Sequence, residues 1–325
     1  MSRTVLAVDG GNSKTDLALL RDDGALLALV RGGLSSPHHL GLDGCVDLLG
    51  SLRADAAARA GIDGTPADVG ALLLAGIDFP VEERRLYDAV SPLGWARRLT
   101  VGNDTFAVLR AGTERGWGVA VVCGAGINCV GVGPDGAQVR FPALGPITGD
   151  WGGGFDVGLA ALSAAARSED GRGPRTRLES AVPAHFGLET PRELGEAIHL
   201  DSIPMRRLTE LPPLVYSLAP EDEMAAEIVE RLAGEIVALV RTTVRRLGLE
   251  GDGVEVLLGG GLLRGADERL YAAIRAGLPG MELRAAASPP IVGAALLGLD
   301  ELGAGPDAHD RARRELGEAV ERIDG

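Results

Sequence analysis

A pattern of strand, glycine turn and strand occurs twice in this chain, and it restricts the possible folds more than any other feature. The first copy reads TVLAVDGGNSKTDLALLRDDGALLALV, and the second, from Gly118, reads GVAVVCGAGINCVGVGPDGAQVRF. When Val8-Asp9-Gly10-Gly11 is aligned with Val122-Cys123-Gly124-Ala125, the later Asp-Gly turns of the two copies also fall close together. We interpret this as an internal duplication with one copy per lobe; chance recurrence of a common hairpin is the alternative.

Helix and strand patterns follow each copy. A helix is expected at roughly residues 44–61, then the apolar strand ALLLAGID, a helix around 81–90 and a short strand ending in VGND. After the second copy, residues 168–220 are rich in Pro, Arg and Glu and indicate short helices. A long helix is predicted over 221–247, followed by the strand VEVLL, a Gly-Gly-Gly turn and further helices.

The length of 325 residues favours two domains, because a single core rarely grows that large. We expect an α/β fold with an N-terminal lobe over residues 1–113 and a C-terminal lobe over 114–325. The final helices are expected to pack back on the first lobe. The last stretch, about 307–324, is charged on most faces and predicts an exposed terminal helix.

Composition excludes several classes of partner. The net charge of −14 argues against nucleic acid and against an anionic membrane surface, because both attract clustered Lys and Arg. No apolar run approaches the length that spans a bilayer. The chain begins directly with a strand-like run, and Cys45, Cys123 and Cys129 lack the spacing of a zinc site or disulfide framework. We therefore expect a cytoplasmic protein with a small-molecule substrate. A homodimer is expected as a separate prediction.

The first glycine turn has the composition of a phosphate cradle. Glycines allow close approach of backbone N–H groups to an anion, hydroxyls add donors and a lysine adds charge. Asp9, at the end of the first strand, is placed to hold Mg²⁺ through water. An ordinary hairpin loop is the alternative, and the spacing is neither a Walker A loop nor a Rossmann fingerprint. The candidate nucleotide contacts here are Gly10, Gly11, Asn12, Ser13, Lys14 and Thr15.

Two further glycine turns are candidates for the same ligand. The turn Gly124-Ala125-Gly126 is the equivalent of the first turn in the second copy. The turn Gly259-Gly260-Gly261 joins a strand to a helix, where a base or ribose can lie against backbone. A tight strand-to-helix turn without a ligand is the alternative for the third cluster.

Two carboxylates stand near the glycine turns. Asp104 ends the strand segment VGND, and Asp150 lies in the polar stretch TGDWGGG. A helix N-cap is the alternative role for Asp104, since many Asp residues at such junctions only cap a helix. The order of three glycine turns and two strand-end carboxylates along the two lobes favours a functional site.

These motifs resemble the BadF/BadG/BcrA/BcrD-type ATPase family, and within it the N-acetylglucosamine kinases. The family's first phosphate loop is matched by VDGGNSKTD, its sugar-side strand by LLLAGID and its catalytic-aspartate segment by VGNDTFAV. Its second phosphate loop is matched by CGAGINCVGV, the following stretch by GDWGGGFDVG and its adenosine loop by LLGGGLL. The resemblance runs from about Thr4 to Leu299.

The resemblance implies a two-lobed actin-like (ribonuclease H-like) ATPase fold, with a duplicated βββαβαβα core and an interlobe cleft. It implies ATP and Mg²⁺ as cofactors, with Asp9 on the metal side and the three glycine clusters on the nucleotide. Asp104 matches the catalytic base, whereas Gly76, Asn128 and Asp150 match positions that contact the sugar, together with Asp104. The implied reaction is transfer of the ATP γ-phosphate to a sugar hydroxyl, here the 6-hydroxyl of N-acetylglucosamine ahead of glucosamine.

The chain departs from the family pattern at three places. Pro37 stands where the amino-sugar kinases usually carry an Asn, so that His38 or His39 would have to replace a sugar contact. Trp151 replaces an acidic residue, either as a wall for the sugar or as a core anchor. The second phosphate loop reads Cys-Gly-Ala-Gly where a hydroxyl and two glycines are common.

Two rival functions remain open. The same family contains activator ATPases of 2-hydroxyacyl-CoA dehydratases, which share an iron–sulfur cluster between two subunits and need cysteine ligands for it. A sugar-sensing regulator on a kinase scaffold would normally carry a helix-turn-helix and a basic face. The cysteine positions disfavour the first rival, and the presence of Asp104 disfavours the second.

Overall fold

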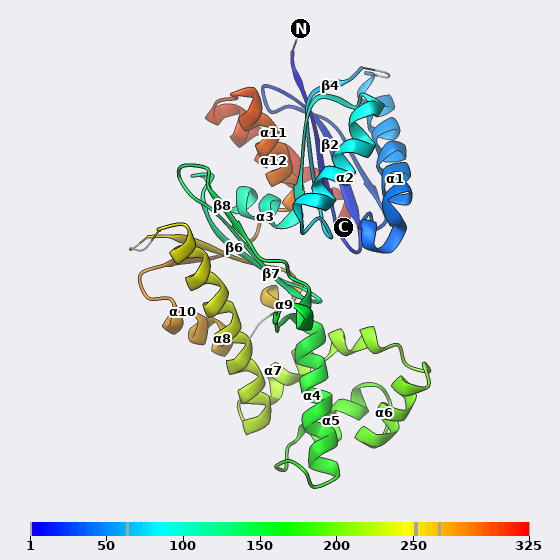
Figure 1. Cartoon of the computed structure of the whole chain (residues 1–325), viewed down its shortest axis with the longest axis vertical. Coiled ribbons are helices and arrows are strands. Elements are labelled where there is room, and N and C mark those ends of the chain that lie inside the picture. Colours follow the sequence, from blue (N-terminus) through cyan, green and yellow to red (C-terminus); the bar gives the residue numbers. More distant parts are fainter. Residues whose placement is uncertain (1, 63–64, 250–252, 266–267, 325) are drawn as a thin grey trace. The chain divides into compact units, whose positions relative to one another are not determined.

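The computed structural model describes residues 2–62, 65–249, 253–265 and 268–324 of the chain (Figure 1). By its internal contacts the chain divides into two compact units. The first unit comprises residues 1–120, 130–142 and 286–325, and the second comprises 121–129 and 143–285. The helices after residue 286 therefore belong to the same unit as the N-terminal strands.

A five-stranded mixed sheet forms the centre of the first unit, in the order β3–β2–β1–β4–β5. The hairpin strands pair antiparallel, whereas β1 pairs with β4, and β4 with β5, in parallel. The parallel strands thus end at one edge of the sheet. The strand bounds are β1 Thr4–Gly10, β2 Thr15–Arg21, β3 Leu26–Gly32, β4 Ala67–Leu74 and β5 Ala96–Asn103.

Helices cover both faces of this sheet, which explains why β1 is apolar on both sides. Val5, Leu6, Ala7 and Val8 are all buried. Helices α1 and α2 pack on one side, and α3, α11 and α12 lie on the other (Figure 1). The bounds are α1 Pro37–Ala60, α2 Pro80–Val90, α3 Asp104–Gly112, α11 Pro290–Leu302 and α12 Pro306–Asp324.

Two details of these helices correct the sequence predictions. Helix α1 begins seven residues earlier than expected, so that His38 and His39, which lie before the predicted helix, are in its first turn. The pattern is interrupted by Gly41, whose φ of 71° is not helical. Helix α12 is not fully exposed: one face buries small and aliphatic side chains, among them Ala312 and Leu316.

The second sheet repeats the first. Its order, β8–β7–β6–β9–β10, is the order of the first sheet with each strand replaced by its equivalent in the second copy. The predicted duplication of the β-sheet core is therefore confirmed. The bounds are β6 Gly118–Cys123, β7 Ile127–Val132, β8 Gln138–Arg140, β9 Glu255–Gly259 and β10 Glu282–Ala285.

Most of the second unit is helical. The expected long helix is α8, in which Ile228, Leu232 and Ile236 are buried. The region of short helices between residues 168 and 220 is also confirmed. No helix among the described residues combines the length and apolarity needed to cross a membrane. The helices are α4 Gly153–Glu169, α5 Leu178–His185, α6 Pro191–His199, η3 Met205–Glu210, α7 Pro212–Leu218, α8 Glu223–Arg246, α9 Gly261–Arg264 and α10 Glu268–Gly277.

Candidate active site

The candidate site residues are divided between the two units. In the first unit, Asp9 lies at the end of β1 and is partly buried. Burial raises the pKa of Asp9 well above its ordinary value, and the negative charges of Asp104 and Asp16 raise it further. Lys14 and Arg31 lower it, but do not compensate fully. A carboxylate with uncompensated negative neighbours fits a divalent cation, as Mg²⁺ prefers such oxygen ligands.

The first glycine turn is a tight hairpin connection. The N–H of Gly11 donates to the carbonyl of Lys14 at 2.9 Å, so this N–H is not free for an anion. Asn12, Ser13 and Lys14 are exposed. The hydroxyl of Thr15 is buried and donates to the Gly33 carbonyl at 2.8 Å, which gives it a structural bond. Their role as nucleotide contacts stays a prediction, with Ser13 and Lys14 as the accessible groups.

Asp104 is the first residue of α3 and is not the N-cap of this helix. The N-cap is Asn103, whose Oδ1 accepts a hydrogen bond from the Thr105 N–H at 2.9 Å. Burial raises the pKa of Asp104 to about 7, and the charge of Asp78 contributes to this rise. A carboxylate with a pKa near 7 is suited to take up a proton at neutral pH.

Asp78 is the residue beside the site that sequence reasoning missed. It lies in the segment between β4 and α2, two residues beyond the predicted Gly76. Its Oδ1 accepts a hydrogen bond from Asn103 Nδ2 at 2.8 Å, which connects it to the start of α3. The pKa of Asp78 is raised to about 6. Burial is the largest cause, and repulsion from the charge of Glu82 is the second. The motif LLLAGID contained this signal, since it ends in a polar residue after a buried strand.

Gly76 cannot carry a side chain without displacing its neighbours. Its φ is 79°, and a Cβ atom there would lie 2.4 Å from Cδ2 of His38 and 2.8 Å from the Ser36 hydroxyl. The glycine therefore allows the first turn of α1 to approach the end of β4. This brings the helix that carries His38 next to the predicted sugar-side loop.

In the second unit, the turn Gly124-Ala125-Gly126 meets the N-terminus of α4. The carbonyl of Gly124 accepts from the Gly154 N–H at 2.7 Å, and that of Ala125 accepts from the Phe155 N–H at 3.0 Å. Two N–H groups at the start of α4 are thus satisfied by this turn. The hydrogen bonds fix the turn between β6 and β7 in place.

The third glycine turn packs on the same strand end. Gly260 has a φ of 95°, and a Cβ atom there would lie 2.2 Å from the carbonyl oxygen of Cys123. Only glycine fits this contact, so the predicted second and third turns are brought together within the second unit. At Gly261, in contrast, no atom lies within 4 Å of an added Cβ atom.

A cavity of about 340 Å³ lies where these two turns meet. Tyr216 of α7 contributes to its wall, although its side chain is only 5% exposed. The Tyr216 hydroxyl has no hydrogen-bond partner among the described residues. An unpaired buried hydroxyl is costly, and this one belongs to a residue of the cavity wall. The cavity is lined by Gly124, Ala125, Gly154, Thr209, Pro212, Pro213, Tyr216, Gly261, Leu262 and Gly265.

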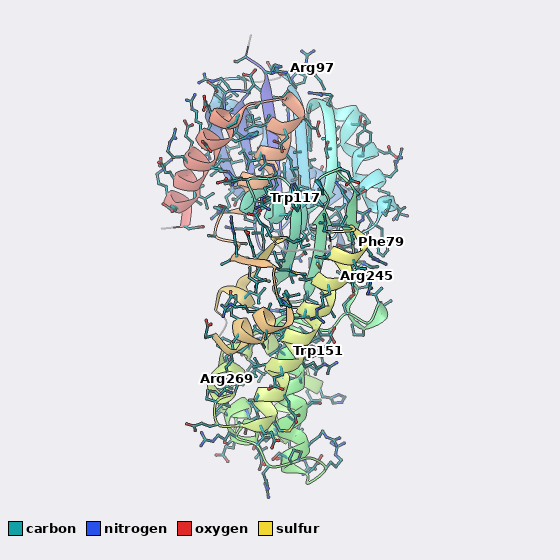
Figure 2. The ribbon with its side chains drawn as sticks, turned by 90° about the vertical axis from the view of Figure 1, so that its left-hand side faces the viewer. Phe79, Arg97, Trp117, Trp151, Arg245 and Arg269 are labelled. Carbon is teal, nitrogen blue, oxygen red and sulfur yellow. The ribbon has the colours of Figure 1, made fainter. Side chains whose placement is uncertain are left out.

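The predicted sugar contacts of the second unit make only local bonds. Asn128 is partly buried in β7, and its Oδ1 accepts from the Cys129 N–H at 2.7 Å. Asp150 is partly buried and accepts a hydrogen bond from the Thr148 hydroxyl. Trp151, labelled in Figure 2, has the guanidinium of Arg231 stacked 4.0 Å from its ring centroid. One face of the Trp151 ring is thus covered by Arg231.

The duplicated sheets define the class of this protein. A hexokinase from Schistosoma mansoni complexed with glucose matches the structure with a TM-score of 0.58 at 13% identity, over 91% of this chain and 85% of that chain. The chain has the actin-like ATPase fold. Residues 6–298 match the BadF/BadG/BcrA/BcrD ATPase family, and the chain belongs to this family.

Two characterised relatives are sugar kinases. The N-acetylmuramic acid/N-acetylglucosamine kinase of Clostridium acetobutylicum is 26% identical over 80% of this chain and 85% of its own length. The N-acetyl-D-glucosamine kinase of Dictyostelium discoideum is 26% identical over 92% of this chain and 99% of its own length. The distant similarity to N-acetylglucosamine kinases is therefore confirmed, and membership of the family implies ATP binding.

Proposed function

We propose that this protein is an ATP-dependent kinase of an amino sugar, with N-acetylglucosamine ahead of glucosamine as the substrate and the 6-hydroxyl as the acceptor. The observation that carries the proposal is the environment of Asp104. Asn103 and not Asp104 is the N-cap of α3, and the pKa of Asp104, which burial raises to about 7, suits a general base. Both characterised relatives phosphorylate N-acetylglucosamine by name, which supports the choice of sugar.

In this mechanism Asp104 accepts the proton of the sugar hydroxyl as that hydroxyl attacks the γ-phosphate. MgATP supplies the phosphoryl group, and its metal ion neutralises charge that develops on the phosphate oxygens. Asp9 would hold the Mg²⁺ through water, and the exposed ammonium of Lys14 can approach a phosphate. The rest of the work is positioning, since phosphoryl transfer needs little covalent chemistry from the protein.

Binding of the two substrates is assigned to separate sets of side chains. The cavity beside Gly260, with the unpaired Tyr216 hydroxyl, would hold the adenosine part of ATP. Gly76, Asn128 and Asp150 would contact the sugar. Fixed polar groups of this kind discriminate sugars strongly, because a missing hydroxyl on the ligand leaves them unpaired.

The activator-ATPase alternative is disfavoured by the cysteines. Cys45, Cys123 and Cys129 are all free and buried, and burial raises the pKa of each thiol to about 12. Cluster ligands must be thiolates, and these three sites oppose ionisation. The kinase proposal therefore has the stronger chemical support.

A sugar panel tests the proposal. Purified protein with MgATP is assayed by ADP release, and kcat/KM is compared for N-acetylglucosamine, glucosamine, N-acetylmannosamine and glucose. The proposal expects N-acetylglucosamine to have the highest value. A clear preference for glucose would contradict the proposed amino-sugar substrate but not the kinase activity. Hydrolysis of ATP that does not depend on a sugar would contradict the kinase activity itself.

A further inference from the structure

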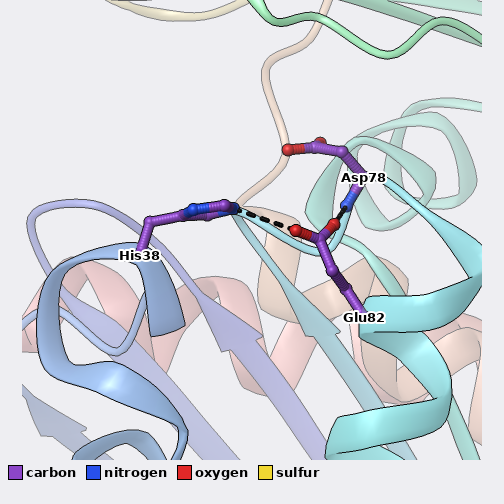
Figure 3. A group of neighbouring side chains, drawn as sticks. All are labelled: His38, Asp78 and Glu82. Carbon is purple, nitrogen blue, oxygen red and sulfur yellow. Dashed lines mark hydrogen bonds and ion pairs between the residues drawn. The ribbon is translucent and has the colours of Figure 1, made fainter.

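Three side chains converge beside the end of β4, and the proposed reaction assigns none of them to the nucleotide, to Mg²⁺ or to proton transfer. They are His38 from the first turn of α1, Asp78 from the segment after β4, and Glu82 from the first turn of α2 (Figure 3). One donor atom from each residue lies within 4.8 Å of the other two. Nε2 of His38 and Oε1 of Glu82 are 3.4 Å apart.

Each carboxylate has one oxygen held by the protein. Oε2 of Glu82 accepts hydrogen bonds from the N–H groups of Asp78 at 2.8 Å and Phe79 at 2.9 Å. Oδ1 of Asp78 accepts from Asn103 Nδ2 at 2.8 Å. Oε1 of Glu82 is the atom paired with Nε2 of His38, and no other described residue binds it or the second oxygen of Asp78 by a hydrogen bond. Metal ligands are commonly oriented in this way, with one oxygen fixed by an outer hydrogen bond and the other directed at the ion.

Local backbone features place His38 in reach of the carboxylates. Pro37 occupies the first turn of α1, where its fixed φ suits a helix start. Gly76 leaves the space that the imidazole occupies, since a Cβ atom there would lie 2.4 Å from His38 Cδ2. The side chain of His38 is 53% exposed, and a cavity of about 190 Å³ runs along it, Gly76 and Glu82. The cluster is therefore accessible to an ion from solvent.

The charge of the cluster also favours a cation. The carboxylates of Asp78 and Glu82 lie in the cluster beside a single imidazole. The guanidinium of Arg140, a neighbouring cation, is itself paired with Glu83. With a neutral imidazole the three ligands carry two negative charges, which matches a divalent ion.

We propose that His38, Asp78 and Glu82 form a binding site for one divalent transition-metal ion, with Zn²⁺ as the best fit. Tetrahedral Zn²⁺ with bonds of about 2.0–2.2 Å places its ligand atoms about 3.3–3.6 Å apart, a range that includes the His38–Glu82 separation. Imidazole nitrogen favours Zn²⁺ or Co²⁺ over Mg²⁺, which prefers oxygen alone. The site is distinct from the Mg²⁺ position proposed at Asp9, and it does not depend on the proposed kinase activity.

Cobalt gives a direct test, because its visible absorption reports its ligands. The full chain, freed of metal with a chelator, is titrated with Co²⁺ in excess Mg²⁺, and bound Co²⁺ is then displaced with Zn²⁺. One Co²⁺ per chain is expected, with Zn²⁺ displacing it. His38→Ala and Glu82→Gln should each weaken Co²⁺ binding by about tenfold or more.

Matched controls are available at exposed positions. His39→Ala removes the neighbouring exposed histidine, and Asp88→Asn removes an exposed carboxylate of α2; both should leave Co²⁺ affinity unchanged. Glu82→Gln can still accept the two N–H bonds of the helix start, and the melting temperature of each variant verifies its fold. Lack of stoichiometric uptake, equal loss in His39→Ala, or retention in a folded His38→Ala variant would each overturn the proposal. A thiolate absorption band would do the same, since it would assign the ion to cysteine.

Discussion

The two sheets have one strand order but opposite chemistry at their strand ends. The end of β1 carries Asp9, whose pKa is raised by burial and then by the charge of Asp104. The equivalent position at the end of β6 is Cys123. Its side chain is buried, and Gly260 packs against its backbone carbonyl. The first strand end thus presents a carboxylate, and the equivalent strand end presents a thiol and backbone contacts. In the proposed function, proton transfer and Mg²⁺ are assigned to the first unit and the nucleotide to the second.

The largest effect is expected from the carboxylate end. Asp104→Asn keeps the size of the side chain but removes the base, so kcat for sugar phosphorylation should fall by about 10²-fold or more. ATP affinity should remain, because the proposed adenosine cavity belongs to the other sheet. Steady-state kinetics and a nucleotide titration measure the two quantities. Asp88→Asn, at an exposed position of α2, is the control, and equal activity in both variants would break the comparison.

The pH dependence should also originate at this end. Asp104 must be ionised to accept a proton, so kcat/KM should fall about tenfold per pH unit below its pKa of about 7 and level off above it. Asp78→Asn removes a negative charge that raises this pKa, and should move the midpoint to lower pH. A profile from about pH 5 to pH 9 checks both expectations. If the midpoint does not move in Asp78→Asn, the charge of Asp78 does not affect the pKa of the catalytic base.

At the Gly259-Gly260-Gly261 turn, a substitution should change both the stability of the protein and its binding of MgATP. Gly260→Ala forces a side chain into a positive φ and against the Cys123 carbonyl, which should lower the free energy of unfolding by at least about 1–3 kcal/mol. The rise in melting temperature caused by MgATP should also be reduced. Gly261→Ala, where no atom lies within 4 Å of the added Cβ, should keep its stability. Thermal unfolding with and without MgATP compares them, and equal stability would refute the packing of this turn.

The smallest effect concerns the Tyr216 hydroxyl. Tyr216→Phe should weaken ATP binding by about 0.5–1.5 kcal/mol, which is a few-fold to about tenfold, through one lost hydrogen bond. The free protein should be as stable as before or more stable, because an unpaired buried hydroxyl is removed. Calorimetric titration with ATP and thermal unfolding give the two values. Tyr87→Phe, on an exposed side chain of α2, is the control. Unchanged ATP affinity would assign the cavity to something else.

Local patterns were sufficient to predict the two sheets. Alternating apolar runs and glycine turns mark β1, β2, β6 and β7, and the repeat of their spacing indicated the duplication. The separate roles of Asn103 and Asp104 could not be predicted, because either residue can cap α3 and only the backbone geometry decides.

The nucleotide cavity and the histidine cluster depend on contacts between distant segments. Tyr216 reaches the glycine turns only through the packing of the short helices between residues 168 and 220, where periodicity is weak. The cluster of His38, Asp78 and Glu82 requires the first turn of α1. This turn could not be predicted from helical periodicity, because the non-helical Gly41 interrupts the pattern. Tertiary proximity of this kind leaves no signal in the spacing of a single sequence.

Direct observation of the phosphate tests the central claim, that Asp104 directs transfer of the γ-phosphate of ATP to an amino sugar. Phosphorus NMR of a reaction with MgATP and N-acetylglucosamine identifies the product. With the unaltered chain, N-acetylglucosamine 6-phosphate is expected in equal amount to ADP, and with Asp104→Asn very little of either product is expected. Inorganic phosphate as the only product, or undiminished sugar phosphate from the variant, would contradict it.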